Sequence, residues 1–314
     1  MGIRRCNSLV IGITMIGILV ATCLSFHAAY RCRHSGACCR AGWTIPFDHD
    51  ERERVHALRL GGGSLTAAPD GATVASRHAD GTCTFFEGTS HLCAIHHAAG
   101  HAALPLTCRM FPRVVLHDGR GTLISLSHFC PTAAGLLFEP GLSWPPVGIV
   151  EAPPALTDVG PLDGLDARDV WPPLLRPGVM MDLESYGAWE RLGIELLTRE
   201  GIAPDVSLNA LAATTSRIVS WSPGGTVPLL HAVHDAFGML APLPTAVLDA
   251  HEPALKRWLA ARLFGNWVAY QGDGLQAIVS SLRGCLATFT TELARDGSPL
   301  EAIRRSDLLI LHKA

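Results

Sequence analysis

Residues 32–43 read CRHSGACCRAGW and hold three of the ten cysteines of this 314-residue chain. Four more follow, so that seven cysteines form the pattern C-x5-CC-x43-C-x9-C-x14-C-x21-C, which comprises Cys32, Cys38, Cys39, Cys83, Cys93, Cys108 and Cys130. Thiols gathered in this way are either oxidised in pairs or shared by a metal, and an odd number cannot all pair within one chain. The pattern therefore favours a metal centre over a set of disulfides.

The ligand type narrows the kind of metal centre. Thiolates are soft ligands that suit zinc and iron–sulfur clusters, and four of them complete one such site. Seven exceed one site, and because neighbouring side chains point in different directions, we expect Cys38 and Cys39 to have different roles. The chain lacks the repeated C-x2-C knuckles of common zinc modules, so we expect an iron–sulfur cluster of the [4Fe-4S] type ahead of zinc. Disulfides in an exported protein remain the alternative.

Basic side chains accompany the cysteines. Arg109 and Arg113 could offset the negative charge that several thiolates concentrate in a poorly solvated place, although a solvated basic loop is the simpler interpretation. His96, His97 and His101 follow one another closely, and His97 and His101 would share a helical face on which they could clamp a metal. Ordinary hydrogen bonding is the alternative for these histidines.

The composition describes a globular chain, with 48% hydrophobic residues and a net charge of −3. A chain of this length can bury a sizeable core, and we expect two globular parts. The 25 basic residues against 28 acidic ones leave no positive stripe for phosphate backbones, so nucleic-acid binding is not expected. The remaining cysteines, Cys6, Cys23 and Cys285, are interpreted as small apolar residues.

An uncharged apolar run extends from Leu9 to Phe26 and follows Arg4 and Arg5. Its length is at the lower limit for a membrane-spanning helix, so an anchor, a signal peptide and a misassigned start codon all fit. Basic residues flank the run on both sides, which favours a cytoplasmic location for the rest of the chain only weakly. We therefore expect a cytoplasmic protein, with anchoring to the inner membrane through residues 9–26 as the open alternative.

Composition divides the chain into four segments. These are an apolar segment 1–26, a cysteine-cluster domain 27–140, a proline-rich connector 141–180 and an α-helical domain 181–314. Glycines break the second segment into short pieces, so metal ligation would supply cohesion that a small core lacks. The fold class expected is mainly α with irregular loops, in which a cysteine-cluster metal domain precedes an α-helical domain.

Helix signals recur in the last segment. Asp182 and Asp205 can cap helices, and Ser298-Pro299-Leu300-Glu301 is a capping box. Prolines fit the first turns of two further helices. One expected helix begins after Asp182. The others cover residues 205–221, 228–240, 253–270, 274–295 and 298–311.

Four short motifs surround the cysteines. They are Cys38-Cys39-Arg-Ala-Gly-Trp43 followed by Ile45-Pro-Phe-Asp48, the pair Cys83-Thr-Phe-Phe and His-Leu-Cys93-Ala-Ile95, the stretch Thr-Cys108-Arg-Met-Phe-Pro-Arg113, and Cys130-Pro-Thr-Ala-Ala-Gly-Leu-Leu137. From Arg31 to about Phe138 this pattern resembles the YkgJ-type cysteine-cluster superfamily. More narrowly, it is similar to the flagellin lysine N-methylase family, for which the long interval between Cys93 and Cys108 is typical.

The resemblance implies an iron–sulfur protein that transfers methyl groups from S-adenosylmethionine to lysine side chains of a flagellin-like protein partner. The seven clustered cysteines are the candidate metal ligands, while catalytic and methyl-donor residues stay unassigned. Two glycine-rich stretches, residues 61–64 and 223–226, do not connect a clear strand to a helix and are interpreted as loops. A zinc- or iron-binding module without catalysis is the alternative function.

Overall fold

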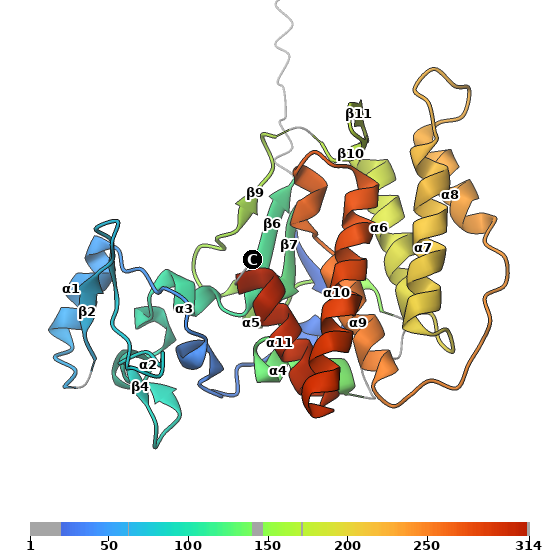
Figure 1. Cartoon of the computed structure of the whole chain (residues 1–314). Helices are drawn as coiled ribbons and strands as arrows, with labels where there is room; N and C mark the ends of the chain where they lie inside the picture. The colour runs from blue at the N-terminus through green and yellow to red at the C-terminus, as the bar shows by residue number, and fades with distance from the viewer. Residues whose placement is uncertain (1–19, 62, 140–146, 171, 313–314) are drawn as a thin grey trace, which may run out of the picture.

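The computed structural model describes residues 20–312 except residues 62, 140–146 and 171. Short helices and strands around the cysteines lie on one side of the molecule, and longer helices lie on the other (Figure 1). A β-sheet separates the two parts. The strands within the described residues are β1 (Ala21–Leu24), β2 (Leu65–Ala67), β3 (Thr73–Ala75), β4 (Phe86–Glu87), β5 (Leu92–Cys93), β6 (Arg113–Asp118), β7 (Gly121–Leu126), β8 (Ile149–Glu151), β9 (Leu165–Asp166), β10 (Leu174–Arg176) and β11 (Val179–Met180).

Helices predominate over strands. The α-helices are α1 (His49–Ala57), α2 (Ala94–Ala99), α3 (Leu106–Met110), α4 (Pro131–Phe138), α5 (Pro154–Thr157), α6 (Leu183–Thr198), α7 (Pro204–Val219), α8 (Leu229–Gly238), α9 (Glu252–Leu263), α10 (Leu275–Asp296) and α11 (Pro299–His312). Short 3-10 helices include η1 (His27–Ala29), η2 (Ala37–Arg40), η3 (His101–Ala103) and η5 (Trp267–Tyr270). The expected class, mainly α with irregular loops around the cysteines and a helical C-terminal part, is confirmed.

The central sheet is a feature that the sequence patterns above do not predict. Its five strands have the order β8-β1-β7-β6-β9. β6 and β7 form an antiparallel hairpin, while β1 pairs parallel with β7 and antiparallel with β8. Gly121 opens β7 with φ +128°, and a Cβ there would lie 2.7 Å from the carbonyl oxygen of Val20. The chain that leads into β1 therefore approaches β7 so closely that glycine is required at this position.

The two faces of the sheet support different cores, because successive strand residues point to opposite sides. The face toward the long helices adds three sheet residues to the main core, which are Leu24, Leu116 and Leu123. The other face builds a smaller core beside the cysteine-rich part, to which the sheet contributes Cys23, Val115 and Ile124. The sheet thus holds the cysteine-rich part and the helical part against each other.

The predicted helices of the C-terminal part are largely present, with differences at their ends. Asp182 caps α6 and accepts a hydrogen bond from the amide of Ser185 at 2.7 Å, as expected. Asp205 does not cap α7, because the helix begins one residue earlier at Pro204, and proline suits the first turn. The single helix expected over 253–270 is interrupted, since α9 ends at Leu263 before Gly265 with φ +59°.

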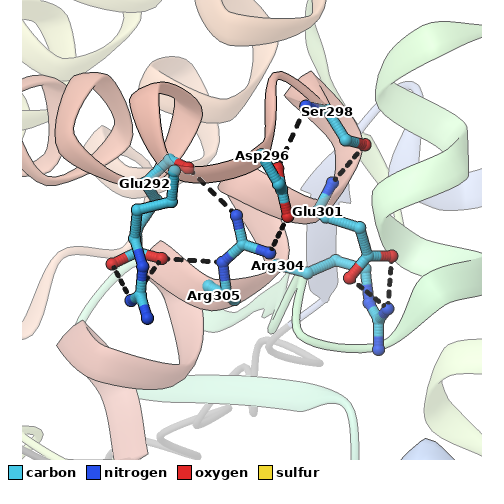
Figure 2. A network of polar contacts seen from close by, with 7 residues as sticks. Glu292, Asp296, Ser298, Glu301, Arg304 and Arg305 are labelled. Atoms are coloured by element: carbon cyan, nitrogen blue, oxygen red, sulfur yellow. Dashed lines mark hydrogen bonds and ion pairs between the residues drawn. The ribbon is translucent and has the colours of Figure 1, made fainter.

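The predicted capping box at the start of α11 forms only in part (Figure 2). Ser298 Oγ accepts from the amide of Glu301 at 3.4 Å, whereas the Glu301 carboxylate accepts from Arg304 at 2.6 Å. Arg305 donates to Glu292 of α10 at 2.7 Å and also contacts Asp296 (Figure 2). These ion pairs fix α11 against the end of α10.

The apolar N-terminal run enters this fold only with its last residues. Leu24 and Phe26 are fully buried, and residues 21–24 form β1. Within the described part of the chain, no helix combines the length and the apolar character needed to cross a membrane. Residues 9–19 of the run lie outside the described residues, so the expectation of an anchor there stays a prediction.

Two histidine rings, one of them from η1, lie in contact in the interior of the protein. His27 and His128 are fully buried, and their Nε2 atoms lie 3.1 Å apart. Burial lowers the pKa of His128 to about 3, and burial together with the neighbouring His128 lowers the pKa of His27 well below its usual value. Both rings are therefore neutral in the folded chain at neutral pH.

These histidines predict a loss of stability in acid. The unfolded chain binds their protons near pH 6.5, whereas the folded chain does not, so stability declines as the pH falls below about 6.5. For His128 the decline extends toward about pH 3 with a slope of at most about 1.4 kcal/mol per pH unit, and His27 acts in the same direction. We expect urea unfolding of His27→Gln to show a shallower decline between pH 6.5 and 4.5 than the unsubstituted chain. An unchanged slope would contradict the assignment.

Candidate metal centre

A cavity of about 390 Å³ is lined by residues of the cysteine-rich part together with Ala155, Asp158 and Val159. Six of the seven predicted ligands line it, namely Cys32, Cys38, Cys39, Cys93, Cys108 and Cys130. Cys83, the seventh, is buried beside this group, and its amide donates to the carbonyl oxygen of Cys39 at 2.8 Å. The fold therefore gathers cysteines that are far apart in sequence around one cavity.

Five of these thiols form a group of their own. Cys38, Cys39, Cys83, Cys93 and Cys108 belong to the small hydrophobic core of the cysteine-rich part. The Cys39 thiol is hydrogen-bonded to the sulfurs of Cys38 and Cys93. This donation lowers the pKa of Cys38, lowers the pKa of Cys93 to about 7, and correspondingly raises the pKa of Cys39 itself. The direction of these shifts favours the thiolate form of Cys38 and Cys93 over that of Cys39.

Burial shifts the pKa values of the other two thiols of the group, Cys83 and Cys108, upward. It raises the pKa of Cys108 well above its usual value, and the nearby sulfurs of Cys38 and Cys93 add to the increase. Burial likewise raises the pKa of Cys83. Because thiolates crowded in a poorly solvated place repel one another, they need a cation among them to be ionised together.

Cys32 and Cys130 lie apart from that group. Cys130 belongs to the core beneath the sheet, and its sulfur is 3.9 Å from the hydroxyl of Tyr30. Cys32 is exposed, and its sulfur is 4.0 Å from Nδ1 of His34. The seven predicted ligands therefore divide into a group of five and two further cysteines that line the same cavity.

The local backbone explains how the thiols reach the cavity. Cys38 and Cys39 lie in η2, which follows Gly36 in the left-handed conformation. Cys93 and Cys130 each stand immediately before a helix, α2 and α4 respectively, in extended backbone. In this position the first amides of a helix point toward the sulfur, and the amides of Ile95 and His96 contribute to the lowered pKa of Cys93.

Gly36 offers a sharp test of this geometry. Its φ is +67°, and a Cβ would lie 2.4 Å from the Phe86 ring and 3.3 Å from the carbonyl oxygen of His91. Gly36→Ala is therefore expected to displace η2 and weaken metal retention at least tenfold, measured by competition with a chelator. Gly42→Ala is the control, because Gly42 has a similar φ of +80° but open space around it, so that only about 1 kcal/mol of backbone strain is expected. Equal losses in the two variants would contradict the role of Gly36.

The two predicted arginines have different surroundings. Arg113 lines the cavity and is held by the carbonyl oxygens of Leu156 and Ala155, each at 2.7 Å. Arg109 instead faces Glu51 of α1 at 4.0 Å, and Glu51 also accepts from the amide of Leu106 at 2.7 Å. Arg113 thus lines the cavity and Arg109 does not, although burial, and after it His96 and both arginines, lower the pKa of His101 at the cavity wall.

The predicted pairing of His97 with His101 is wrong. α2 ends at Ala99, and Gly100 with φ +79° reverses the chain before His101. His97 is exposed and contacts Glu87 at 3.3 Å, away from the cavity. His96 and His101 line the cavity instead, with ring centres 5.9 Å apart.

Trp43 of the Gly-Trp motif joins the cysteine-rich part to the C-terminal helix. Its ring centre is 4.9 Å from that of Phe111 and 4.8 Å from that of His312 in α11. His312 in turn is 3.0 Å from the hydroxyl of Ser127. A second cavity of about 320 Å³ opens beside this contact.

The donor set fits a thiophilic metal. Five buried or half-buried sulfurs provide more than the four ligands that zinc or a [4Fe-4S] cluster takes. Among the described residues, no group of three or more His, Cys, Asp and Glu side chains stands ready in metal-binding geometry. Metal binding therefore requires rotation of thiol side chains, and Cys39 would exchange its hydrogen bonds to Cys38 and Cys93 for a ligand bond.

Comparison with known proteins supports the cysteine-cluster assignment. Residues 31–131 match the family model CxxCxxCC, described as "Putative zinc- or iron-chelating domain". This range contains all seven clustered cysteines, so the expected cysteine-cluster character is supported at the level of metal chelation. No curated protein and no solved structure matches the chain.

The name of that model specifies four cysteines, and the chain provides three of them. In Cys32-x2-Ser35-x2-Cys38-Cys39, a serine stands at the second position. Ser35 lines the cavity, and so does the neighbouring His34. The sequence pattern was therefore informative about the cysteines but not about Tyr30, His34 and Asp158, which join the cavity wall without a spacing signal.

Proposed function

We propose that this chain is a metalloprotein in which four of the five grouped thiols hold an iron–sulfur cluster. The observation that carries the proposal is the convergence of Cys38, Cys39, Cys83, Cys93 and Cys108 from four separate segments into one poorly solvated place. Sulfur donors select zinc or iron–sulfur clusters over magnesium and calcium. The match to a zinc- or iron-chelating model supports the same class of metal.

Anaerobic metal analysis tests this proposal. We expect brown protein that absorbs near ~400 nm and carries about four iron atoms per chain, as one [4Fe-4S] cluster requires. Colourless protein that contains zinc in place of iron would overturn the iron–sulfur assignment and leave a zinc centre on the same thiols.

Methyl transfer is the activity that we propose for this centre. The resemblance to flagellin lysine N-methylases supports it, and so does the cavity beside the thiols, since about 390 Å³ lies within the usual range for small-molecule sites. Transfer to lysine requires a neutral amine aligned with the sulfonium methyl of S-adenosylmethionine. The carboxylate of Asp158 at the cavity wall is the acidic group available to receive a lysine side chain.

Labelled S-adenosylmethionine distinguishes this activity from a metal module without catalysis. We expect the anaerobic protein to retain the labelled donor on a desalting column and to transfer label to lysines of a flagellin-like protein. A metal module without catalysis would retain no labelled donor on the column and would transfer no label to lysine. Asp158→Asn is expected to reduce transfer at least tenfold while the iron content stays unchanged.

For the location, we propose a cytoplasmic protein that contacts the inner membrane through residues 9–19 of the apolar run, because Leu24 and Phe26 at its end are buried in the fold. The support is the apolar run itself, of which only the last residues lie in the described structure. Sedimentation of the full chain with membranes, and its release by deletion of residues 1–19, are the expected results.

A further inference from the structure

We propose that His34, His96 and His101, together with Cys32, form a second metal site in the wall of the cavity, made of other side chains than the group of five thiols. The site would take a borderline divalent cation such as Zn²⁺ or Co²⁺. This inference does not rest on methyl transfer or on the identity of the metal held by the other cysteines.

The ring of His96 lies near each of the other two rings at distances close to those of imidazoles that share an ion. The ring centre of His96 is 5.0 Å from that of His34 and 5.9 Å from that of His101. Two imidazoles bound to one tetrahedral zinc ion at about 2.1 Å have ring centres roughly 5 Å apart. Small rotations of the side chains would thus allow both pairs to meet at one cation.

Cys32 can provide a fourth ligand. Its sulfur is 4.0 Å from Nδ1 of His34, and a thiolate and an imidazole on one zinc ion have donor atoms about 3.6 Å apart. Cys32 is not part of the core that holds the other five thiols, so its use here leaves that group complete. All four side chains line the same cavity.

The backbone also brings these residues together from three separate places. His34 has φ +52°, an uncommon conformation for a residue other than glycine, and it directs the loop toward His96. Gly100 reverses the chain after α2 and returns His101 to the ring of His96. His97, the immediate neighbour of His96, points to Glu87 instead and does not line the cavity.

The serine that stands at one position of the four-cysteine pattern agrees with a site that combines histidine nitrogen and cysteine sulfur ligands. Ser35 occupies the position of the second cysteine in the CxxCxxCC arrangement, and it is flanked by His34. A nitrogen-rich site beside Cys32 would differ in metal preference from a site made of thiols alone, because imidazole suits zinc and other borderline cations.

Metal titration tests the second site without reference to enzyme activity. The protein is isolated anaerobically with its own metal, titrated with Zn²⁺, desalted and analysed for zinc and iron. We expect one zinc equivalent more than the isolated protein contains. In His96→Ala and His101→Ala we expect this equivalent to be lost or its Kd to rise about tenfold or more, with unchanged iron.

His97→Ala is the matched control, since it removes a histidine from the same helix but not from the cavity. It should bind Zn²⁺ as the unsubstituted chain does. Co²⁺ adds a spectroscopic readout, because the sulfur-to-cobalt absorption should disappear in Cys32→Ser. Equal zinc binding by His96→Ala and the unsubstituted chain would overturn the proposal, as would an equal loss in His97→Ala. Failure of the iron–sulfur assignment would appear separately, in the metal content before titration.

Discussion

Cys108→Ser is expected to abolish metal binding by the group of five thiols and to unfold the cysteine-rich part, while Cys285→Ser retains both metal and fold. Cys108 lines the cavity and interacts electrostatically with Cys38, Cys83 and Cys93. Bound structural metal contributes on the order of 10 kcal/mol to small cysteine-rich folds, which is comparable to the whole stability of a domain. Serine provides a much poorer ligand for zinc or iron at this position.

Cys285 is a suitable control because it is a buried cysteine that lies in α10, in the helical part, outside the group of five thiols. Metal content measured by elemental analysis and resistance to trypsin are the two readouts. The cysteine-rich part of Cys108→Ser should be digested under conditions in which Cys285→Ser is intact. Equal metal content in both variants would show that Cys108 is not a ligand.

Asp307→Ala is expected to reduce the free energy of unfolding by about 3 to 5 kcal/mol, because it leaves two buried donors unsatisfied. Asp307 is fully buried in α11. Its carboxylate accepts from the amide of His128 at 2.5 Å and from the indole of Trp258 at 2.8 Å. The residue therefore connects the loop before Cys130 with both α9 and the C-terminal helix.

The matched control is Glu301→Ala in the same helix. Glu301 pairs with Arg304 near the surface, so its removal should change the free energy of unfolding by at most about 1 kcal/mol (Figure 2). Urea unfolding monitored by circular dichroism compares the two variants. Similar losses would indicate that the Asp307 carboxylate is dispensable and that general disturbance of α11 accounts for the effect.

Sequence patterns predict the helical part well because its helices carry local start signals. Asp182 and the prolines at positions 228, 253 and 299 act within a single turn, and they mark the observed starts to within a residue. The break at Gly265 was missed because an isolated glycine in a helical pattern is often tolerated.

The sheet was missed for a different reason. A signal for its hairpin exists in Asp118-Gly119, which separates two apolar runs. β1, however, pairs with strands that lie about a hundred residues later in the chain, and its apolar residues fit a membrane helix equally well. Such long-range pairing leaves no local pattern.

The candidate site shows the same division between local and long-range information. Cysteine spacing predicts seven candidate ligands, and the structure brings six of the seven to one cavity. The spacing cannot show that five sulfurs group together, nor that His96 rather than His97 faces the cavity. Both depend on the turn at Gly100 and on packing between segments that are distant in sequence.

The position of β1 has a consequence for the order in which this protein matures during synthesis. β1 precedes every clustered cysteine, yet its antiparallel partner β8 follows all of them. A nascent chain that has just released Cys130 from the ribosome therefore has all its thiols but an incomplete sheet, with one edge of β1 unpaired. A metal that binds at that stage would bind to a cavity that lacks the wall residues following Cys130 in the chain. The cavity wall is therefore completed only after residues 149–159 have emerged, since Ala155, Asp158 and Val159 line the cavity.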